Sequence, residues 1–196
     1  MISAIVLAAG KSERMDRCKQ LANFGDKCMV DQVISSVEKS KVGEIIVVLG
    51  HRAEDIRRKI SKRDVKMVIN EEYEEGMSTS LKSGLLEVSD RTDAVLVVLA
   101  DQPLIEPETI DQLIDEYRKS ESSIVAPVYK GVRGNPVILD ISLRDEIINI
   151  RGDIGARNIL NDRRDEIREV EVDTPSVVFD VNTREDLERV RKNFGG

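Results

Sequence analysis

The residues best suited to chemistry lie near the beginning of the chain, where an apolar run over residues 2–7 gives way to a small, basic loop. Small side chains let backbone N–H groups approach phosphate oxygens closely, and basic side chains neutralise the charge of a triphosphate. The loop therefore predicts a nucleotide site, and an ordinary strand-to-loop connection with solvated charges is the alternative. The candidate residues of the nucleotide site are Leu7, Ala8, Ala9, Gly10, Ser12, Arg14 and Lys19.

Two familiar phosphate-binding motifs do not fit this loop. The triplet Gly10, Lys11 and Ser12 matches the end of a Walker A loop, but that motif needs a glycine at the position of Ile5. A dinucleotide-binding fingerprint needs three spaced glycines, and the loop has only Gly10. The sequence therefore predicts neither a P-loop nor a dinucleotide-binding domain.

Two carboxylates at predicted strand ends are candidates for holding a metal ion. Asp101 follows the apolar run 94–99, and Asp180 follows the apolar residues 177–179. Mg²⁺ prefers oxygen ligands and usually shares them with substrate phosphates. Capping of a turn or helix is the alternative for each carboxylate, although Thr183 could cap the last helix in place of Asp180.

A third signal combines Asn70 with a glycine and hydroxyl residues at a predicted helix start. The segment that contains Gly76, Ser78 and Ser80 would offer free N–H groups and side-chain oxygens to a base, ribose or phosphate. Helix capping by Ser78 is the alternative, and Met77 is predicted to be a core residue.

A fourth signal is a pair of polar clusters that flank a predicted insertion. Arg133 and Asn135 belong to the first cluster, and Asp153 and Arg157 belong to the second. Arginines at such positions suit a second anionic ligand. Surface turns and a helix start would explain the glycines nearby, but not both arginines.

The composition excludes several classes of protein. With 40% apolar and 34% charged residues, and no apolar stretch near the roughly 20 residues of a membrane helix, the chain is expected to be cytoplasmic, with no membrane partner. A net charge of -7 argues against nucleic acid as a partner, because phosphate contacts favour a basic surface. Cys18 and Cys28 are too few for a zinc site and are expected to be reduced thiols, and His51 is expected in a surface loop.

The elements that must position these residues alternate between strands and helices. Continuous Val- and Ile-rich runs, typical of strands buried on both faces of a parallel sheet, occur at 45–49, 65–69, 94–99 and 124–126. Segments of helical spacing separate them, and residues 128–139 predict a hairpin inserted in the sheet. Further strands are predicted at 167–172 and 177–179, and helices at 143–150, 155–160 and 183–193.

The predicted fold class is α/β, a three-layer Rossmann-like sandwich with a mostly parallel sheet and an inserted β-hairpin region. A chain of this length is expected to form one domain over residues 1–196. Ligands of such folds bind at the carboxyl ends of the strands, where Gly10, Gly50, Asn70 and Asp101 fall.

Six motifs resemble, in this order, the molybdenum cofactor cytidylyltransferase family of MobA-like NTP transferases: LAAGKSERM with Lys19, NEEYEEGMSTSLKSGL, LADQP, RGNP, GDIGAR and FDVNTREDLE. The resemblance spans nearly the whole chain and implies a fold like that of nucleotide-diphospho-sugar transferases. It implies that the first loop holds the triphosphate and that Arg14, Lys19 and Asp101 are catalytic. Asp101 and Asp180 would be the ligands of Mg²⁺.

The resemblance also implies which molecules are bound. Asn70, Ser78 and Ser80 would serve the nucleotide, and the cytidylyl branch resembles LAAG whereas the guanylyl branch resembles LAGG, so Ala9 favours CTP. Molybdopterin, the organic part of molybdenum cofactor, is the expected acceptor, and a molybdoenzyme is a further, transient partner. The residues expected to face the acceptor are Gly76, Arg133, Asn135, Asp153 and Arg157.

Three residues depart from the family pattern. Asp16 stands where glycine is frequent and places an acidic group near the expected triphosphate. Asn182 stands where a second aspartate is common, which leaves Asp180 as the principal carboxylate on that side, and Arg184 stands where proline is common.

The expected reaction is Mg²⁺-dependent attack of an acceptor phosphate on the α-phosphate of CTP, with release of pyrophosphate. Such a nucleophile is already anionic, so positioning and charge neutralisation are expected to provide the catalysis. Guanylyl or other nucleotidyl transfer to a different phosphorylated acceptor is one alternative. A non-enzymatic protein that binds or delivers molybdenum cofactor is the other.

Overall fold

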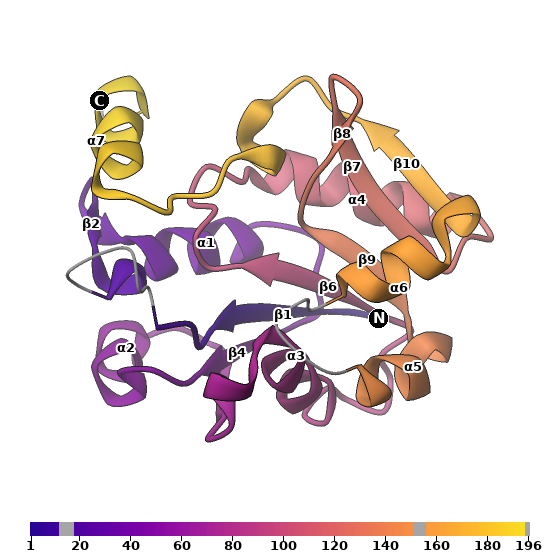
Figure 1. Cartoon of the computed structure of the whole chain (residues 1–196), viewed down its shortest axis with the longest axis horizontal. Coiled ribbons are helices and arrows are strands. Elements are labelled where there is room, and N and C mark those ends of the chain that lie inside the picture. The colour runs from indigo at the N-terminus through magenta and orange to yellow at the C-terminus, as the bar shows by residue number, and fades with distance from the viewer. Residues whose placement is uncertain (12–17, 151–155, 195–196) are drawn as a thin grey trace.

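A mixed sheet forms the centre of the computed structural model, which describes residues 1–11, 18–150 and 156–194. Its strands are β1 (Ile2–Ala8), β4 (Glu44–Leu49), β5 (Lys66–Ile69), β6 (Ala94–Leu99), β7 (Ile124–Tyr129), β8 (Val132–Arg133), β9 (Val137–Asp140) and β10 (Ile167–Glu171). The order across the sheet is β10-β7-β9-β6-β1-β4-β5, with β8 paired to β7 (Figure 1). Neighbouring strands are parallel except for β9, which is antiparallel to both β6 and β7, and β8. A separate ribbon consists of β2 (Asn23–Phe24) and β3 (Lys27–Cys28).

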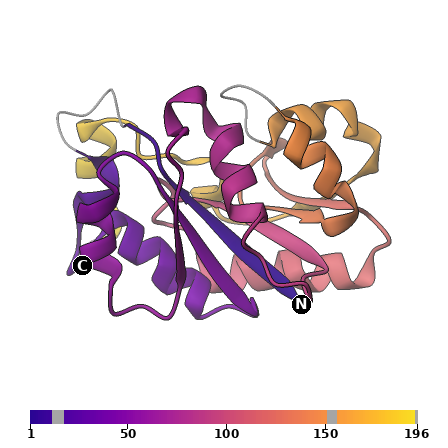
Figure 2. The same cartoon turned by 90° about the horizontal axis from the view of Figure 1, so that it is seen from below.

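Helices cover both faces of this sheet, which gives three layers. One face carries α1 (Met29–Glu38), α2 (Ala53–Ile60) and α4 (Pro107–Lys119). The other face, seen in Figure 2, carries α3 (Met77–Leu85), α5 (Arg144–Asn149) and α6 (Arg157–Asp162). A last helix, α7 (Arg184–Phe194), packs beside the start of α1. Short 3-10 turns complete the chain: η1 (Lys19–Leu21), η2 (Tyr73–Glu75), η3 (Ile141–Leu143), η4 (Arg164–Glu166) and η5 (Pro175–Val178).

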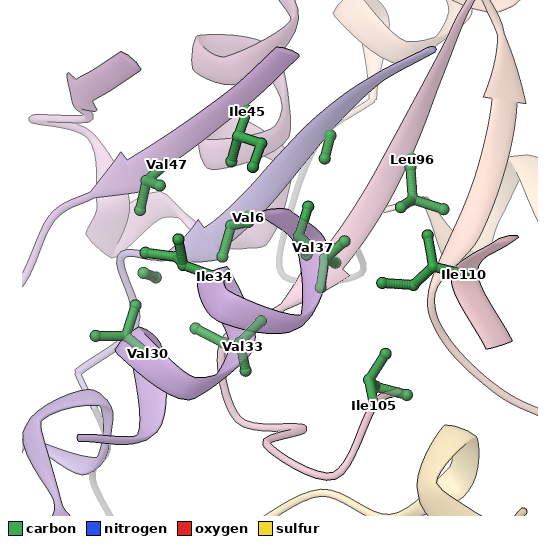
Figure 3. Packing of buried hydrophobic residues seen from close by; sticks show 14 of the residues in the cluster. Val6, Val30, Val33, Ile34, Val37, Ile45, Val47, Leu96, Ile105 and Ile110 are labelled. Atoms are coloured by element: carbon green, nitrogen blue, oxygen red, sulfur yellow. The ribbon is translucent and has the colours of Figure 1, made fainter. Parts of the chain in front are cut away.

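The predicted α/β sandwich is therefore confirmed, and the physical reason lies in the strands. Successive side chains of β1 point to opposite faces, so that Val6 packs under α1 and Ile5 packs under α3. Figure 3 shows Val33 and Ile34 of α1 among the buried strand residues on the face of the sheet that carries α1, α2 and α4. No helix in the described ranges has the length and apolar composition needed to cross a membrane.

The strand order creates a crevice at one edge of the sheet. From β1 the chain continues to β4 and β5 on one side, and it then returns to β6 on the other side of β1. In open α/β sheets, ligands bind at such a reversal, outside the carboxyl ends of the strands. Backbone hydrogen bonds tie this edge together, because Ala100 N–H donates to Leu7 O at 3.2 Å and Asn70 N–H donates to Leu49 O at 2.7 Å.

Two predicted strands differ from the structure. Residues 65–69 are less buried than predicted. Met67 and Val68 pack against the cores on opposite faces but are only partly buried, because β5 is an edge strand with one neighbour, and Ile69 is 48% exposed. Residues 177–179 do not form a strand, since η5 occupies most of this segment. Pro175 begins that turn, and the Thr174 hydroxyl accepts a hydrogen bond from Ser176 N–H at 3.3 Å.

Tyr117 fixes α4 to β9, the strand inserted beside β6. Its hydroxyl donates to the Asp140 carboxylate, and burial together with this acidic neighbour raises the pKa of Tyr117 above its usual range. A phenol whose pKa is higher in the folded chain stabilises that chain fully below about pH 10 and loses this effect as the pH rises. We therefore expect the melting temperature of Tyr117→Phe, followed by circular dichroism, to fall less steeply than that of the wild type above about pH 10. Parallel profiles for the two proteins would contradict the assignment.

Candidate functional site

A pocket of about 150 Å³ opens at the carboxyl ends of β1 and β6. The crevice thus brings together the end of the first strand, the residues after β6 and the start of α3. The predicted residues that line it are Leu7, Ala9, Gly10, Lys19, Gly76, Ser80 and Asp101. The pocket is also lined by residues that the motifs do not predict to contact a ligand: Gln20, Tyr73, Met77, Leu99 and Ala100.

Lys19 joins the first loop to the residues at the end of β6. Its Nζ donates to Asp101 Oδ2 at 2.6 Å and to Asn182 Oδ1 at 3.2 Å. The side chains of the ion pair are 15% exposed for Lys19 and 19% exposed for Asp101. Water and salt therefore screen this pair less than a pair on the open surface. The ammonium group is close enough to neutralise charge at Asp101.

Asp180 reaches the same edge of the sheet from the other end of the chain. Gln102 Nε2 donates to Asp180 Oδ1 at 2.7 Å, and Val181 N–H donates to Asp101 O at 2.9 Å. Burial, followed by the charge of Asp101, raises the pKa of Asp180, while the hydrogen bond from Gln102 opposes this rise. Asp180 does not cap α7, because Thr183 Oγ1 accepts from Asp186 N–H at 3.1 Å.

The donor set around Asp101 fits a hard divalent cation. The carboxylates of Asp101 and Asp180 and the amide oxygen of Asn182 are ligands of the kind that Mg²⁺ and Mn²⁺ prefer. Because the charge of Asp101 raises the pKa of Asp180, a cation held between the two carboxylates would relieve their repulsion. Within the described ranges no group of three or more His, Cys, Asp or Glu forms a complete metal site. A metal held here would therefore share its coordination with water or substrate phosphates.

Tyr73 forms a wall of the pocket, although no motif in the sequence predicts a ligand contact for it. A Cβ built on Gly50 would lie 2.7 Å from the Cβ and Cγ of Tyr73 and 2.8 Å from the Cβ of Ala9, so only glycine admits this packing. His51 lies beside the tyrosine, with ring centroids 6.3 Å apart. The usable signal was Gly50 itself, at the end of β4, since a glycine at a strand end marks a close approach.

Asn70 holds the neighbouring loop rather than lining the pocket. Its Nδ2 donates to Thr79 Oγ1 at 2.8 Å and to Ser80 Oγ at 3.0 Å, while its Oδ1 accepts from Glu72 N–H at 3.0 Å. Because the Asn70 residue is only 3% exposed, its polar atoms contact other protein groups instead of solvent. This geometry favours an indirect role, in which Asn70 orients the start of α3.

The beginning of α3 differs from the alternative considered for Ser78, which was helix capping, and from the prediction for Met77. Gly76 is the N-cap residue, with a φ of 112° that favours glycine, and Ser78 is buried in the first turn and caps nothing. Met77 is not a core residue but is 37% exposed. The reason is its position at the first residue of a helix that starts at the crevice, where its side chain lines the pocket.

A second pocket of about 250 Å³ adjoins the first, because Met77 and Leu99 line both. The predicted acceptor residues found there are Arg133, Asn135 and Arg157. Arg133 pairs with Glu169 at 2.8 Å, which orients its guanidinium from β10. The positive charge of Arg157 lowers the pKa of Asp180, although burial dominates, so the second pocket and the carboxylates interact electrostatically. Gly76 lines the first pocket instead of the second.

Ser12, Arg14 and Asp153, together with the unexplained Asp16, fall outside the described residues. Ala8 is buried in the core and lines neither pocket.

Gly134 packs closely against the backbone of η5, the turn that leads to Asp180. A Cβ at this position would lie 2.2 Å from Val177 O, a backbone atom that cannot rotate away. We expect Gly134→Ala to displace η5 and with it Asp180, which would lower the free energy of unfolding in urea by about 1–3 kcal/mol. Gly131→Asn is the control, since Gly131 has open space and a φ of 77° that asparagine tolerates. Equal stability of both variants and the wild type would contradict this contact.

A three-layer α/β sandwich with two adjoining pockets, lined by acidic and basic side chains at the carboxyl ends of the strands, suits the class of enzymes that transfer a nucleotidyl group between phosphorylated ligands. The chain belongs to the MobA-like NTP transferase domain family, whose model matches residues 4–168. The bifunctional protein GlmU of Staphylococcus carnosus is 32% identical over 145 residues, which are 73% of this chain and 31% of that protein. The chain thus spans about a third of the length of the curated relatives it matches.

Solved structures agree with this assignment. Rv0371c from Mycobacterium tuberculosis H37Rv superposes with a TM-score of 0.87 at 26% identity, covering 97% of each chain. A complex of that protein with manganese has a TM-score of 0.84 at 26% identity, covering 97% of this chain and 98% of the other. Mth528, a nucleotidyl transferase from Methanothermobacter, has a TM-score of 0.87 at 25% identity, covering 99% and 97%. The chain therefore shares the fold of these proteins, that of the nucleotide-diphospho-sugar transferases.

Proposed function

We propose that this enzyme transfers the cytidylyl group of CTP to the phosphate of molybdopterin and releases pyrophosphate. The observation that supports the proposal is the pair of adjoining pockets, of which the first contains Lys19 and Asp101 and the second contains Arg133 and Arg157. A nucleotide in the first pocket and a phosphorylated acceptor in the second would meet beside the carboxylates. The arginines would neutralise the acceptor phosphate.

In this proposal an oxygen of the acceptor phosphate forms a bond to the α-phosphorus of CTP, and the bond to the pyrophosphate oxygen breaks. Lys19 and Arg14 neutralise charge on the transferring and leaving groups, and the pockets hold the two phosphates in line. Asp101 and Asp180 would hold Mg²⁺, which when bound supplies positive charge to the phosphate oxygens. No side chain needs to remove a proton, since the attacking phosphate is already anionic.

Ala9 supports cytosine as the base. Its side chain lines the first pocket and lies against the Gly50–Tyr73 contact, so it occupies space that a glycine would leave open. A narrower pocket suits a pyrimidine better than a purine. We further propose that residues 1–196 act as one nucleotidyltransferase domain in the cytoplasm, with a molybdoenzyme as a transient partner that receives the product.

The base is tested by thermal shift with Mg²⁺ and each nucleoside triphosphate. A nucleotide at about a hundredfold its dissociation constant stabilises the folded chain by about 2.7 kcal/mol, and we expect CTP to give the largest shift. Stabilisation by GTP and not by CTP would instead indicate guanylyl transfer.

The reaction is tested by incubating the protein with CTP, Mg²⁺ and molybdopterin. We expect release of pyrophosphate and a new nucleotide conjugate with the mass of molybdopterin plus CMP less one water, as a phosphoanhydride requires. Reaction only with another phosphorylated compound from a cell extract would assign a different acceptor. Binding of molybdopterin without pyrophosphate release would favour a cofactor-delivery protein.

A further inference from the structure

Gln102 is a buried amide for which the proposed chemistry has no direct use. It follows Asp101, and it is 1% exposed. Its backbone is fixed in a tight turn, because its N–H donates to Leu99 O at 3.2 Å and its carbonyl accepts from Ile105 N–H at 3.3 Å. The side chain therefore extends from a rigid base at the end of β6.

The amide of Gln102 has an asymmetric environment. Nε2 donates to Asp180 Oδ1 at 2.7 Å and to Val177 O at 3.3 Å, whereas Oε1 is buried without a hydrogen-bond partner among the residues that the structure describes. Both neighbours of Nε2 are acceptors, so the orientation of the amide follows from its partners. An orphaned buried oxygen costs stability, which calls for a compensating benefit.

The group that depends on the Gln102 amide is the carboxylate of Asp180, which accepts its hydrogen bond. Val177 O also accepts from Asn135 N–H at 2.8 Å, so its satisfaction does not depend on Gln102. Asp180, by contrast, follows η5 in a segment without regular structure, and its negative charge lies close enough to Asp101 for the two to interact. Without a donor at Oδ1, repulsion between the carboxylates would favour rotation of Asp180 away from the site.

We propose that Gln102 is a positioning residue, which anchors one oxygen of Asp180 so that this carboxylate and Asp101 face a single divalent cation. The inference rests on the proposed metal-binding role of the two aspartates. The neutral amide suits this task, because it donates to Asp180 without adding a positive charge that would repel the metal. A carboxylate that is already held in its metal-binding orientation loses less conformational freedom when a cation binds. The hydrogen bond from Gln102 to Asp180 is therefore expected to raise metal affinity.

The test measures Mn²⁺ binding to the full chain by calorimetry, with no nucleotide present. We expect Gln102→Met, a change of similar volume, to weaken Mn²⁺ binding by about tenfold or more, the usual effect of losing a group that orients a metal ligand. Its melting temperature should remain close to that of the wild type, because methionine removes the orphaned oxygen. Gln112→Met is the matched control, since Gln112 Nε2 donates to Glu171 O at 3.2 Å in an exposed contact on α4.

Asp180→Asn separates this inference from the proposed function. We expect Asp180→Asn to weaken Mn²⁺ binding, and Gln102→Met to add no further loss in that background, because Gln102 acts through Asp180. Unchanged Mn²⁺ binding in Asp180→Asn would reject the metal role of Asp180 and therefore the site itself. Wild-type binding in Gln102→Met, or an equal loss in both backgrounds, would reject the positioning role alone.

A second variant keeps the test decisive if methionine unfolds the chain. Gln102→Asn retains an amide of the same polarity, but its side chain is one methylene shorter and does not reach Asp180. We expect weaker Mn²⁺ binding again, with the fold retained. Full metal affinity in this variant would overturn the proposal.

Discussion

Replacing Asp101 by asparagine is expected to lower the rate of nucleotidyl transfer by about a hundredfold or more while the chain still folds. The carboxylate lies at the end of β6, pairs with Lys19 and shares its edge of the sheet with Asp180. An amide of the same shape fills the same space but cannot supply the negative charge that holds a metal cation. Loss of one such electrostatic element costs about 3 kcal/mol in the barrier, which is roughly a hundredfold in rate.

Steady-state release of pyrophosphate measures this effect, and calorimetry with Mn²⁺ measures its cause. Asp115→Asn is the control. Asp115 lies on α4 and pairs with Lys41 at 2.7 Å, and neither residue lines either of the two pockets. We expect the control to retain wild-type turnover and metal affinity. Wild-type turnover in Asp101→Asn would refute the assignment of the metal site.

Replacing Lys19 by methionine is expected to change two properties in opposite directions. Transfer should fall by about a hundredfold, because the ammonium no longer neutralises the transferring and leaving phosphates. Mn²⁺ binding without nucleotide should become about tenfold tighter, or about 1.4 kcal/mol, because Lys19 competes with a metal for Asp101 Oδ2 at 2.6 Å. The long apolar stem is retained by methionine, so packing of η1 should be little altered.

Opposite changes distinguish a competing cation from a residue that merely supports the fold. A structural residue would weaken metal binding and activity together. Lys66→Met is the control, because Lys66 pairs with Glu87 at 2.6 Å at the edge of the sheet. Unchanged or weaker Mn²⁺ binding in Lys19→Met would show that the ammonium does not compete with the metal.

Most of the fold could be predicted from local patterns. Residues such as Val47, Val98 and Val125 belong to continuous apolar runs, because their strands are covered on both faces. The edge strand β5 was misjudged, since a short apolar run carries no record of how many neighbours it will have. The strand predicted at 177–179 is not formed, because η5 begins at Pro175 and is capped by the Thr174 hydroxyl, which accepts a hydrogen bond from Ser176 N–H.

Part of the candidate site was also predictable. Lys19 and Asp101 were identified separately, because each follows a predicted strand whose carboxyl end faces the crevice. Their ion pair joins residues 82 positions apart, and no local pattern indicates such a pair. Tyr73 was missed because its position depends on the close packing of Gly50 against Ala9.

Local sequence patterns predict the alternation of strands and helices, and they place the chemically useful side chains at strand ends. Both properties follow from the periodic burial of neighbouring residues, which a linear pattern records. No local pattern predicts that Lys19 pairs with Asp101, that Gln102 donates to Asp180, or that β9 lies between β6 and β7. These contacts depend on strand order and on the paths of distant loops, which are set by packing of the whole chain.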